Sequence, residues 1–369
     1  MHLHVLIHGL WGNPSHLSEA ERIFRACHPD SDAVHLFIPA SFSDSLTIDG
    51  IDYSAHRVLL ELDDTIATLQ RDPAVRITKL SITGYSLGGL VARYLIGILY
   101  SRKFFDNVQA VNLTTFTTPH VGVPRKLTWL GLILLGRSGK QLYLLDSWSN
   151  TGLPLLQVLA HPQSVFYRGL SQFQNINIYA NAINDVTVPY CSGAFEAEDP
   201  FHAVAERDIV PNYLPEYEPL IEGFSLIKSS PSFTDRLGSL RPLTFNGPLL
   251  EWIFPWNIVL YLLLPIFALV ALVYLPISAI LSSHASRARI RALRDTIAPL
   301  PFHPLDSPPA MSAQQIILSL NALDNVRKFT AFRPGVRNSH AMLICLDARF
   351  ADHRVGRGVL RHWADHFQD

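Results

Sequence analysis

The feature that most constrains this 369-residue chain is the segment 84–88, Gly-Tyr-Ser-Leu-Gly. An apolar, β-branched run at 77–83 precedes it, and a run compatible with a helix follows it at 87–100. A serine at a sharp strand-to-helix turn has a strained backbone, and glycines two residues to either side leave space for the turn. The first N–H groups of the helix would then point at charge that develops on a bound molecule. The pattern predicts that Ser86 is a nucleophile; the alternative is a glycine-rich turn with an incidental serine.

Strand and helix patterns alternate around this segment. Strands are expected at 2–7, 33–38, 77–83, 108–116 and 176–182, and helices at 15–27 and 53–70. Strands that alternate with long helices favour right-handed βαβ units, so we predict an α/β fold with a mostly parallel, doubly wound sheet. After residue 182 the strand pattern lapses until 326–332, and a last helix is expected at about 352–367.

A nucleophilic serine needs a base within hydrogen-bonding reach and a carboxylate that orients the base. In doubly wound hydrolases the acid and then the histidine follow the serine along the chain, each in a loop at the carboxyl end of a strand. Asp185 directly follows the strand at 176–182, and His340 follows the strand at 326–332. We therefore predict a catalytic triad of Ser86, Asp185 and His340.

Each partner has an alternative that the residues leave open. Asp185 could be a turn residue only, in which case Asp199 or Asp208 would supply the acid. His340 competes with fifteen other histidines among the sixteen in the chain. Among them, His202 follows Asp185 too closely for another strand to lie between the two.

An oxyanion would need two preorganised N–H donors. Leu87, directly after the serine, is expected to supply one, and the Leu10 backbone in the loop after the first strand the other. Four further residues are expected to line the site: His8, Gly9, Trp11 and His120. This chemistry requires no metal and no cofactor.

Five blocks of sequence carry a resemblance to a known family. They are His-Gly-Leu-Trp-Gly at 8–12, Gly-Tyr-Ser-Leu-Gly-Gly at 84–89, Thr-Pro-His-Val-Gly at 118–122, Asn-Asp-Val-Thr-Val-Pro-Tyr at 184–190 and Ser-His-Ala at 339–341. In these blocks and their order the chain resembles the fungal branch of the serine esterase (lipase-like) family of the α/β-hydrolase fold, a branch that includes lipid-droplet phospholipases. The resemblance implies the triad of Ser86, Asp185 and His340 and a lipid ester as substrate.

Composition narrows the setting. Hydrophobic residues make up 48% of the chain, which points to lipid contact, whereas the net charge of -1 gives no reason to expect nucleic acid as a partner. Three widely spaced cysteines, Cys27, Cys191 and Cys345, form neither a disulfide framework nor a metal-ligand pattern. Because the segment 2–7 resembles a core strand rather than a secretory signal, we expect a protein that is not secreted and acts on the cytosolic face of a membrane, a lipid droplet or the endoplasmic reticulum.

The segment 252–286 contains no Asp, Glu, Lys or Arg. A single crossing would place His340 on the opposite side of the bilayer from Ser86. Pro265 divides the segment into arms too short to span about 30 Å as helices. We therefore predict a membrane hairpin at 252–283 that enters and leaves from one face, followed by a basic flank at 287–294. Two spans or a buried core helix are the alternatives.

An apolar stretch at 125–145 is interrupted by three glycines and could be a mobile lid or a buried pair of helices. The expected organisation is a hydrolase core at 1–192 with a lid-like insertion at about 125–165, an insertion at 193–310 that carries the hairpin, and the rest of the core at 311–369.

Two classes of function follow from these features. The first is a serine hydrolase that cleaves acyl esters of glycerophospholipids at a membrane or lipid-droplet surface, with a neutral-lipid (triacylglycerol or sterol ester) lipase, an acyl-thioesterase or an acyltransferase as variants. The second is a non-catalytic, membrane-attached scaffold with a hydrolase fold. Head group, acyl position and oligomeric state are not specified by the sequence.

Overall fold

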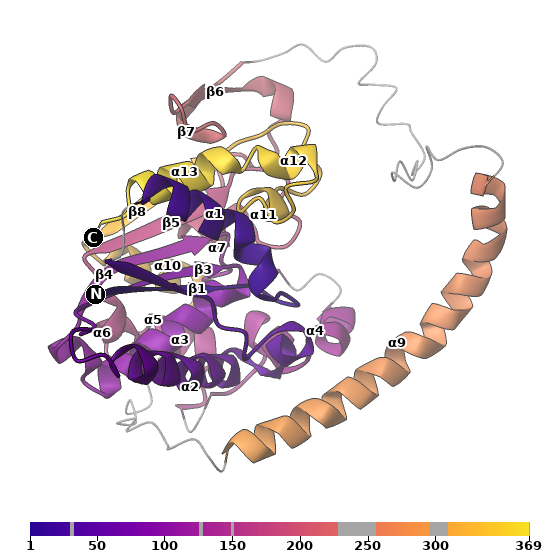
Figure 1. The fold of residues 1–369 in the computed structure, drawn as a ribbon. Helices are drawn as coiled ribbons and strands as arrows, with labels where there is room; N and C mark the ends of the chain where they lie inside the picture. The colour runs from indigo at the N-terminus through magenta and orange to yellow at the C-terminus, as the bar shows by residue number, and fades with distance from the viewer. Residues whose placement is uncertain (30–32, 125–127, 149–150, 228–255, 295–308, 369) are drawn as a thin grey trace.

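A single eight-stranded sheet organises the computed structural model, which describes residues 1–29, 33–124, 128–148, 151–227, 256–294 and 309–368 (Figure 1). The strand order is β2-β1-β3-β4-β5-β8-β7-β6. The strands are β1 (His2–Ile7), β2 (Val34–Phe37), β3 (Lys79–Tyr85), β4 (Gln109–Phe116), β5 (Asn175–Asn181), β6 (Ile209–Tyr213), β7 (Leu220–Leu226) and β8 (Val326–Ala331). Every pair from β2 to β8 is parallel, and the pairs β8–β7 and β7–β6 are antiparallel. The predicted α/β fold with a mostly parallel sheet is confirmed.

Helices cover both faces of this sheet. One face packs against α2 (Ile51–Leu69), α3 (Leu87–Ser101), α5 (Leu155–Ala160), α6 (Val165–Leu170) and α10 (Ala313–Asn321), and the other against α1 (Ser18–Cys27) and α13 (Arg357–Asp365). Successive side chains of a strand point to opposite faces, so Leu3 and Val5 of β1 lie in the first core and Leu6 lies in the second. The chain thus buries apolar residues on both sides of its central strands.

Short elements complete the connections between strands and helices. They are the 3-10 helices η1 (Pro14–Leu17), η2 (Asp44–Asp49), η3 (Phe104–Asp106) and η5 (Glu206–Asp208), and the helices α7 (Tyr190–Ala194), α11 (Ser339–Met342) and α12 (Ala351–Arg354). The helix expected at 352–367 is therefore two helices, α12 and α13.

Strands β6 and β7 were not expected from the sequence. Pro211 lies within β6, which is the edge strand, where a missing N–H costs no ladder hydrogen bond. Gly223 lies within β7 and weakens its alternating pattern. Part of the stretch expected to be an insertion at 193–310 therefore extends the same sheet.

The apolar stretch near residue 130 forms the helix α4 (Thr128–Leu142). Gly136 breaks it with φ 54° and ψ -132°, a conformation that an L side chain rarely adopts. The C-terminal half is fixed, because Arg137 pairs with Asp52 and Ser138 donates to the Thr47 carbonyl. A mobile lid at this position stays a prediction, and its residues 125–127 lie outside the described ranges.

The hairpin predicted at 252–283 is wrong for this structure. A single helix of 39 residues, α9 (Trp256–Arg294), runs through Pro265 and Pro276 without reversing, and residues 252–255 lie outside the described ranges. A proline removes one helical hydrogen bond and bends a helix, whereas a reversal needs several residues outside the helical conformation. Within the described residues, no helix has both the length and the apolar character that a membrane crossing requires.

Candidate active site

Ser86 occupies the turn between β3 and α3, with φ 53° and ψ -123°. This conformation is strained for a residue with a side chain and persists only where the surroundings hold it. A Cβ atom on Gly84 would lie 2.4 Å from the Cα of Gly89. One on Gly88 would lie 2.2 Å from the carbonyl oxygen of Ile7. The glycines on both sides of the serine are therefore required by backbone packing, as the sequence predicted.

His340 lies in α11, which follows β8, and its imidazole reaches the serine. The Nε2 atom lies 3.0 Å from Ser86 Oγ, within hydrogen-bonding distance. Two contacts position the histidine: its N–H donates to the Asn338 side chain, and its carbonyl accepts from the Tyr85 hydroxyl. A neutral imidazole in this orientation can accept the serine proton.

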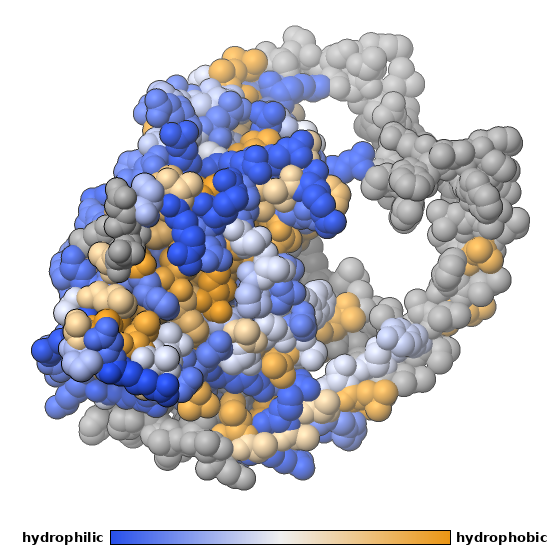
Figure 2. Space-filling model, viewed as in Figure 1, coloured by the Kyte–Doolittle hydropathy of each residue, from blue (hydrophilic) through white to orange (hydrophobic). Residues whose placement is uncertain are grey.

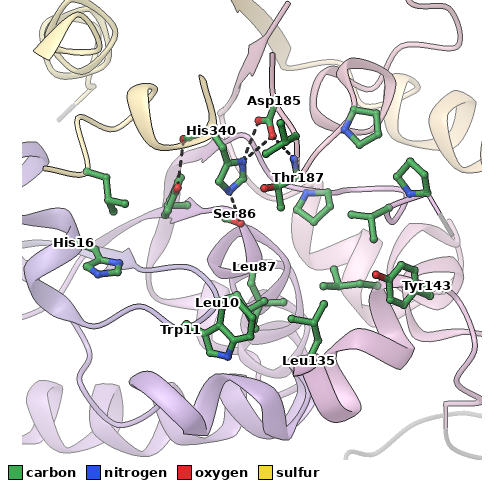
Figure 3. Close-up of a pocket in the computed structure, with 18 of the residues that line it drawn as sticks. Leu10, Trp11, His16, Ser86, Leu87, Leu135, Tyr143, Asp185, Thr187 and His340 are labelled. Carbon is green, nitrogen blue, oxygen red and sulfur yellow. Dashed lines mark hydrogen bonds and ion pairs between the residues drawn. The ribbon is translucent and has the colours of Figure 1, made fainter. Parts of the chain in front are cut away.

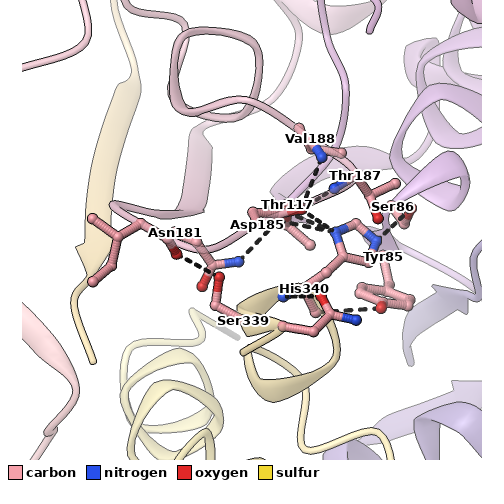
Figure 4. Close-up of polar contacts among 11 residues, drawn as sticks. Tyr85, Ser86, Thr117, Asn181, Asp185, Thr187, Val188, Ser339 and His340 are labelled. Atoms are coloured by element: carbon pink, nitrogen blue, oxygen red, sulfur yellow. Dashed lines mark hydrogen bonds and ion pairs between the residues drawn. The ribbon is translucent and has the colours of Figure 1, made fainter. Parts of the chain in front are cut away.

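Asp185 follows β5 and holds the other nitrogen of the same ring (Figure 4). His340 Nδ1 lies 3.1 Å from Oδ1 and 3.0 Å from Oδ2 of Asp185. Burial alone would raise the pKa of Asp185, but hydrogen bonds from His340, Thr117 and the Val188 N–H outweigh it and lower the pKa below its ordinary value. Asp185 therefore stays ionised at neutral pH, which favours the orientation of the imidazole that the serine requires.

Two residues that the sequence did not reveal also fix Asp185. The Thr117 hydroxyl donates to Oδ2 at 2.5 Å, and the Asn181 amide donates to the same oxygen at 3.0 Å. Thr117 has φ 42°, directly after β4, so a strained turn aims its side chain at the carboxylate. The only sequence signal was the position of both residues at the carboxyl ends of strands.

A cavity of about 890 Å³ opens above Ser86, within the size range of small-molecule sites (Figure 3). In Figure 3, Leu10, Trp11, Leu87 and Leu135 lie on one side of Ser86, and His340, Asp185 and Thr187 lie on the other. The lining also includes the apolar residues Val123 and Leu142, Tyr143, and the polar residues Asp199 and His202. The cavity can thus take a molecule with one apolar and one polar part.

A family model described as "Putative serine esterase (DUF676)" matches residues 1–199, which is more than half of the chain. The chain belongs to this serine esterase family. The matched part contains Ser86 and Asp185, whereas the part with His340 lies beyond it.

Curated proteins similar to this family member are fungal. "Putative lipase C4A8.10" of Schizosaccharomyces pombe is 30% identical over 130 residues, covering 33% of this chain and 17% of that protein. "Putative lipase ROG1" of Saccharomyces cerevisiae is 33% identical over 120 residues, covering 31% of this chain and 17% of that protein. The matched part is thus less than a fifth of the length of either relative.

Two solved structures are similar at low identity. The lin2722 gene product of Listeria innocua is 14% identical, with a TM-score of 0.34, over 52% of this chain and 76% of that chain. Phospholipase PlaB of Legionella pneumophila, in complex with thio-NAD, is 15% identical, with a TM-score of 0.34, over 50% of this chain and 38% of that chain. The sheet and the site described above do not depend on these two matches.

The two expected oxyanion donors of this esterase-family member lie beside its serine. Leu10 and Leu87 both line the cavity, and Leu87 is the first residue of α3. The loop that carries Leu10 passes very close to the serine, because a Cβ atom on Gly9 would lie 2.9 Å from Ser86 Cβ. Trp11 also lines the cavity and is half exposed.

His8 and His120, which were expected to line the site, are buried behind it. The His8 ring stacks on Phe42, and burial lowers its pKa to about 4. His120 pairs with Thr115 and packs against Phe195, and burial lowers its pKa well below the ordinary value. Both rings therefore remain neutral, and they pack beneath the loops that follow β1 and β4 rather than facing the cavity.

The alternative acids take other places. Asp199 lines the cavity, and Asp208 is the last residue of η5, outside the cavity lining. Asp185 alone among the three carboxylates is hydrogen-bonded to His340. Within the ranges that the structure describes, no cluster of three or more His, Cys, Asp or Glu side chains could hold a metal ion.

Proposed function

We propose that this chain is a serine hydrolase that cleaves acyl esters of lipids through an acyl-enzyme on Ser86. The observation that carries the proposal is the continuous hydrogen-bonded series from Ser86 Oγ to His340 to Asp185, at the floor of a cavity with an apolar wall. Residues 254 and 155 positions apart in the sequence meet there, each in a different loop.

The reaction uses only groups of this site. Ser86 Oγ attacks the ester carbonyl carbon while His340 Nε2 takes the serine proton, and Asp185 stabilises the imidazolium. The N–H groups of Leu10 and Leu87 stabilise the oxyanion. His340 then returns the proton to the departing alcohol, which leaves an acyl group on Ser86. Water then attacks the acyl carbonyl carbon while His340 Nε2 takes its proton, and His340 returns that proton to Ser86 Oγ as the bond to the acyl group breaks and the fatty acid leaves.

Two features support a lipid as substrate. The apolar wall of the cavity suits an acyl chain, and the related fungal proteins carry the name lipase. Glycerophospholipids are our first candidate, and neutral lipids or transfer of the acyl group to another alcohol are the variants that a substrate panel separates.

The surface of α9 supports work at a lipid interface. Figure 2 shows orange side chains along the described part of this helix. Five large, mostly apolar side chains of α9 are 38–65% exposed: Leu263, Leu269, Tyr274, Ile280 and Leu281. Exposed Arg287, Arg291 and Arg294 follow and can attract anionic lipid. We propose that α9 rests on the surface of a membrane or lipid droplet on its cytosolic side.

A fluorophosphonate probe tests the enzymatic part of the proposal. We expect the protein to be labelled, and Ser86→Ala to be unlabelled and to lose ester hydrolysis by a factor of about 10⁶. Equal labelling of the protein and of Ser86→Ala would contradict the proposal and favour a non-catalytic scaffold. Hydrolysis of a panel of phospholipids, triacylglycerols and sterol esters then defines the substrate.

A further inference from the structure

The loop that carries Leu10 contains a strained residue, Trp11, within a tight turn that the Gly12 N–H closes on the Gly9 carbonyl at 3.1 Å. Trp11 has φ 52°, a left-handed conformation that is unfavourable for a bulky side chain. Such a conformation persists only where neighbouring groups fix it. This turn hydrogen bond leaves the Trp11 N–H and the Gly12 carbonyl to groups outside the loop, which therefore help to set the position of Leu10 in the cavity.

The helix η2 makes these contacts. The Trp11 N–H donates to the Thr47 hydroxyl at 2.9 Å, and the Asp44 N–H donates to the Gly12 carbonyl at 2.8 Å. One hydrogen bond holds the N–H of Trp11, the residue with the strained φ angle, and the other holds the carbonyl of the next residue. A displacement of η2 would therefore move the backbone that follows Leu10.

The helix α9 holds η2 through one arginine. Arg289 donates to Asp49 with Nη2 at 2.7 Å and Nε at 2.9 Å, and also to the Ser45 carbonyl at 3.3 Å. Asp49 is fully buried and also pairs with Arg57 of α2 at 2.6 Å. A bidentate bond to a buried carboxylate fixes direction as well as distance.

The other arginines of α9 do not share this role. Arg287, Arg291 and Arg294 are exposed, whereas Arg289 is 29% exposed and reaches into the body of the protein. Figure 1 shows α9 extending away from the sheet, and among the described elements it packs mainly against η2 and α4. Arg289 is thus the charged connection between the arm that we place on lipid and the loop beside the nucleophile.

We propose that Arg289 is a positioning residue that transmits the docking of α9 to the oxyanion loop through Asp49 and η2. The inference rests on the proposed function, since it requires a reaction in which the Leu10 N–H stabilises negative charge. Arg289 touches neither substrate nor Ser86. A lipid surface that holds α9 in its docked position would, by the same contacts, favour the active arrangement of Leu10.

Arg289→Gln tests the proposal, with Arg291→Gln as the matched control on the same helix. Loss of Arg289 leaves Asp49 paired with Arg57, so the fold is retained. We expect kcat for a soluble short-chain ester to fall about three- to tenfold at unchanged KM, because oxyanion donors act in the transition state. The rate of fluorophosphonate labelling falls in parallel, since the phosphonyl oxygen occupies the same place. Arg289→Lys keeps the charge but not the two-point bond, and should be intermediate.

Two results would overturn the proposal: an Arg289→Gln variant with the kcat of the unaltered protein, or an equal loss in Arg291→Gln. A lower melting temperature with unchanged kcat would show a structural role only and also overturns it. Failure of the proposed function is a separate outcome, because the unaltered protein would then hydrolyse no ester and label no better than Ser86→Ala.

Discussion

The turn around Ser86 and the helix α9 are held in opposite ways. The turn is buried except where Ser86 faces the cavity, and backbone atoms lie so close to Gly84 and Gly88 that no side chain fits there. The helix α9 has 39 residues, yet among the described elements it packs mainly against η2 and α4. Chemistry at Ser86 depends on tenths of an ångström, whereas attachment to a surface tolerates a displaced helix.

The contrast also appears in the polar groups. At the turn, Asp185 receives hydrogen bonds from two side chains and two backbone N–H groups in addition to His340. On α9, apolar side chains such as Leu269 and Tyr274 are exposed. The polar groups around Asp185 are satisfied by other residues of the chain, whereas α9 presents an apolar surface that an external partner would cover.

The largest effect is expected for a substitution at Asp185, which tests the catalytic role of the residues around Ser86. Asp185→Asn keeps the size of the side chain but removes the charge that stabilises the imidazolium, so kcat for a soluble ester should fall about 10⁴-fold. Binding to liposomes should be unchanged, because α9 is unaltered. Asp208→Asn, outside the cavity, is the control. If Asp185→Asn keeps more than a tenth of the activity of the unaltered protein, the proposed role of Asp185 is contradicted.

The parts that a sequence can predict are those dictated by strand order. Parallel strands place their carboxyl ends at one edge of the sheet, so the order Ser86, Asp185, His340 was sufficient to bring three distant loops together. The local contacts within the loops cannot be predicted in this way. Thr117 reaches Asp185 because its backbone has φ 42°, and the residue type does not indicate that angle.

The missing predictions have physical causes as well. Proline usually indicates that a strand or helix is interrupted. For this reason Pro211 argued against a strand where β6 lies, and Pro265 indicated a hairpin where α9 is continuous. A proline on an edge strand costs no ladder hydrogen bond, and a proline within a helix removes one helical hydrogen bond without reversing the chain. The pairing of Arg289 with Asp49, 240 residues apart, is not readable from either segment alone.

The second prediction tests how tightly the turn is packed. A Cβ on Gly88 would lie 2.2 Å from the Ile7 carbonyl, so Gly88→Ala forces β1 and α3 apart and should lower the free energy of unfolding by about 3 kcal/mol. Gly223→Ala, which has open space around the new methyl group, is the control and should change it by less than about 1 kcal/mol. Equal urea unfolding midpoints for both variants would contradict the packing argument.

The third prediction tests whether α9 is the element that binds lipid. Replacing four exposed residues of α9 by serine (Leu269, Tyr274, Ile280 and Leu281) should weaken liposome binding about a hundredfold and leave hydrolysis of a soluble ester intact. The control replaces four exposed apolar residues of the body: Val210, Leu226, Leu318 and Phe350. If flotation with liposomes is equally weakened in both variants, or in neither, α9 is not the lipid-binding element.

The smallest expected effect lies within the turn region and depends on pH. The Thr117 hydroxyl stabilises the ionised form of Asp185, so Thr117→Val should raise the pKa of that carboxylate towards its ordinary value. The carboxylate stays ionised at pH 7, so kcat should change little there, whereas the acid limb moves to higher pH and the loss grows as the pH falls below about 5. Thr65→Val, which removes a hydroxyl that donates to a carbonyl within α2, is the control. A uniform loss across the pH range would show that Thr117 orients Asp185 without stabilising its charge. The turn around Ser86 and the helix α9 would then differ in how tightly they are packed, but not in how their charges are stabilised.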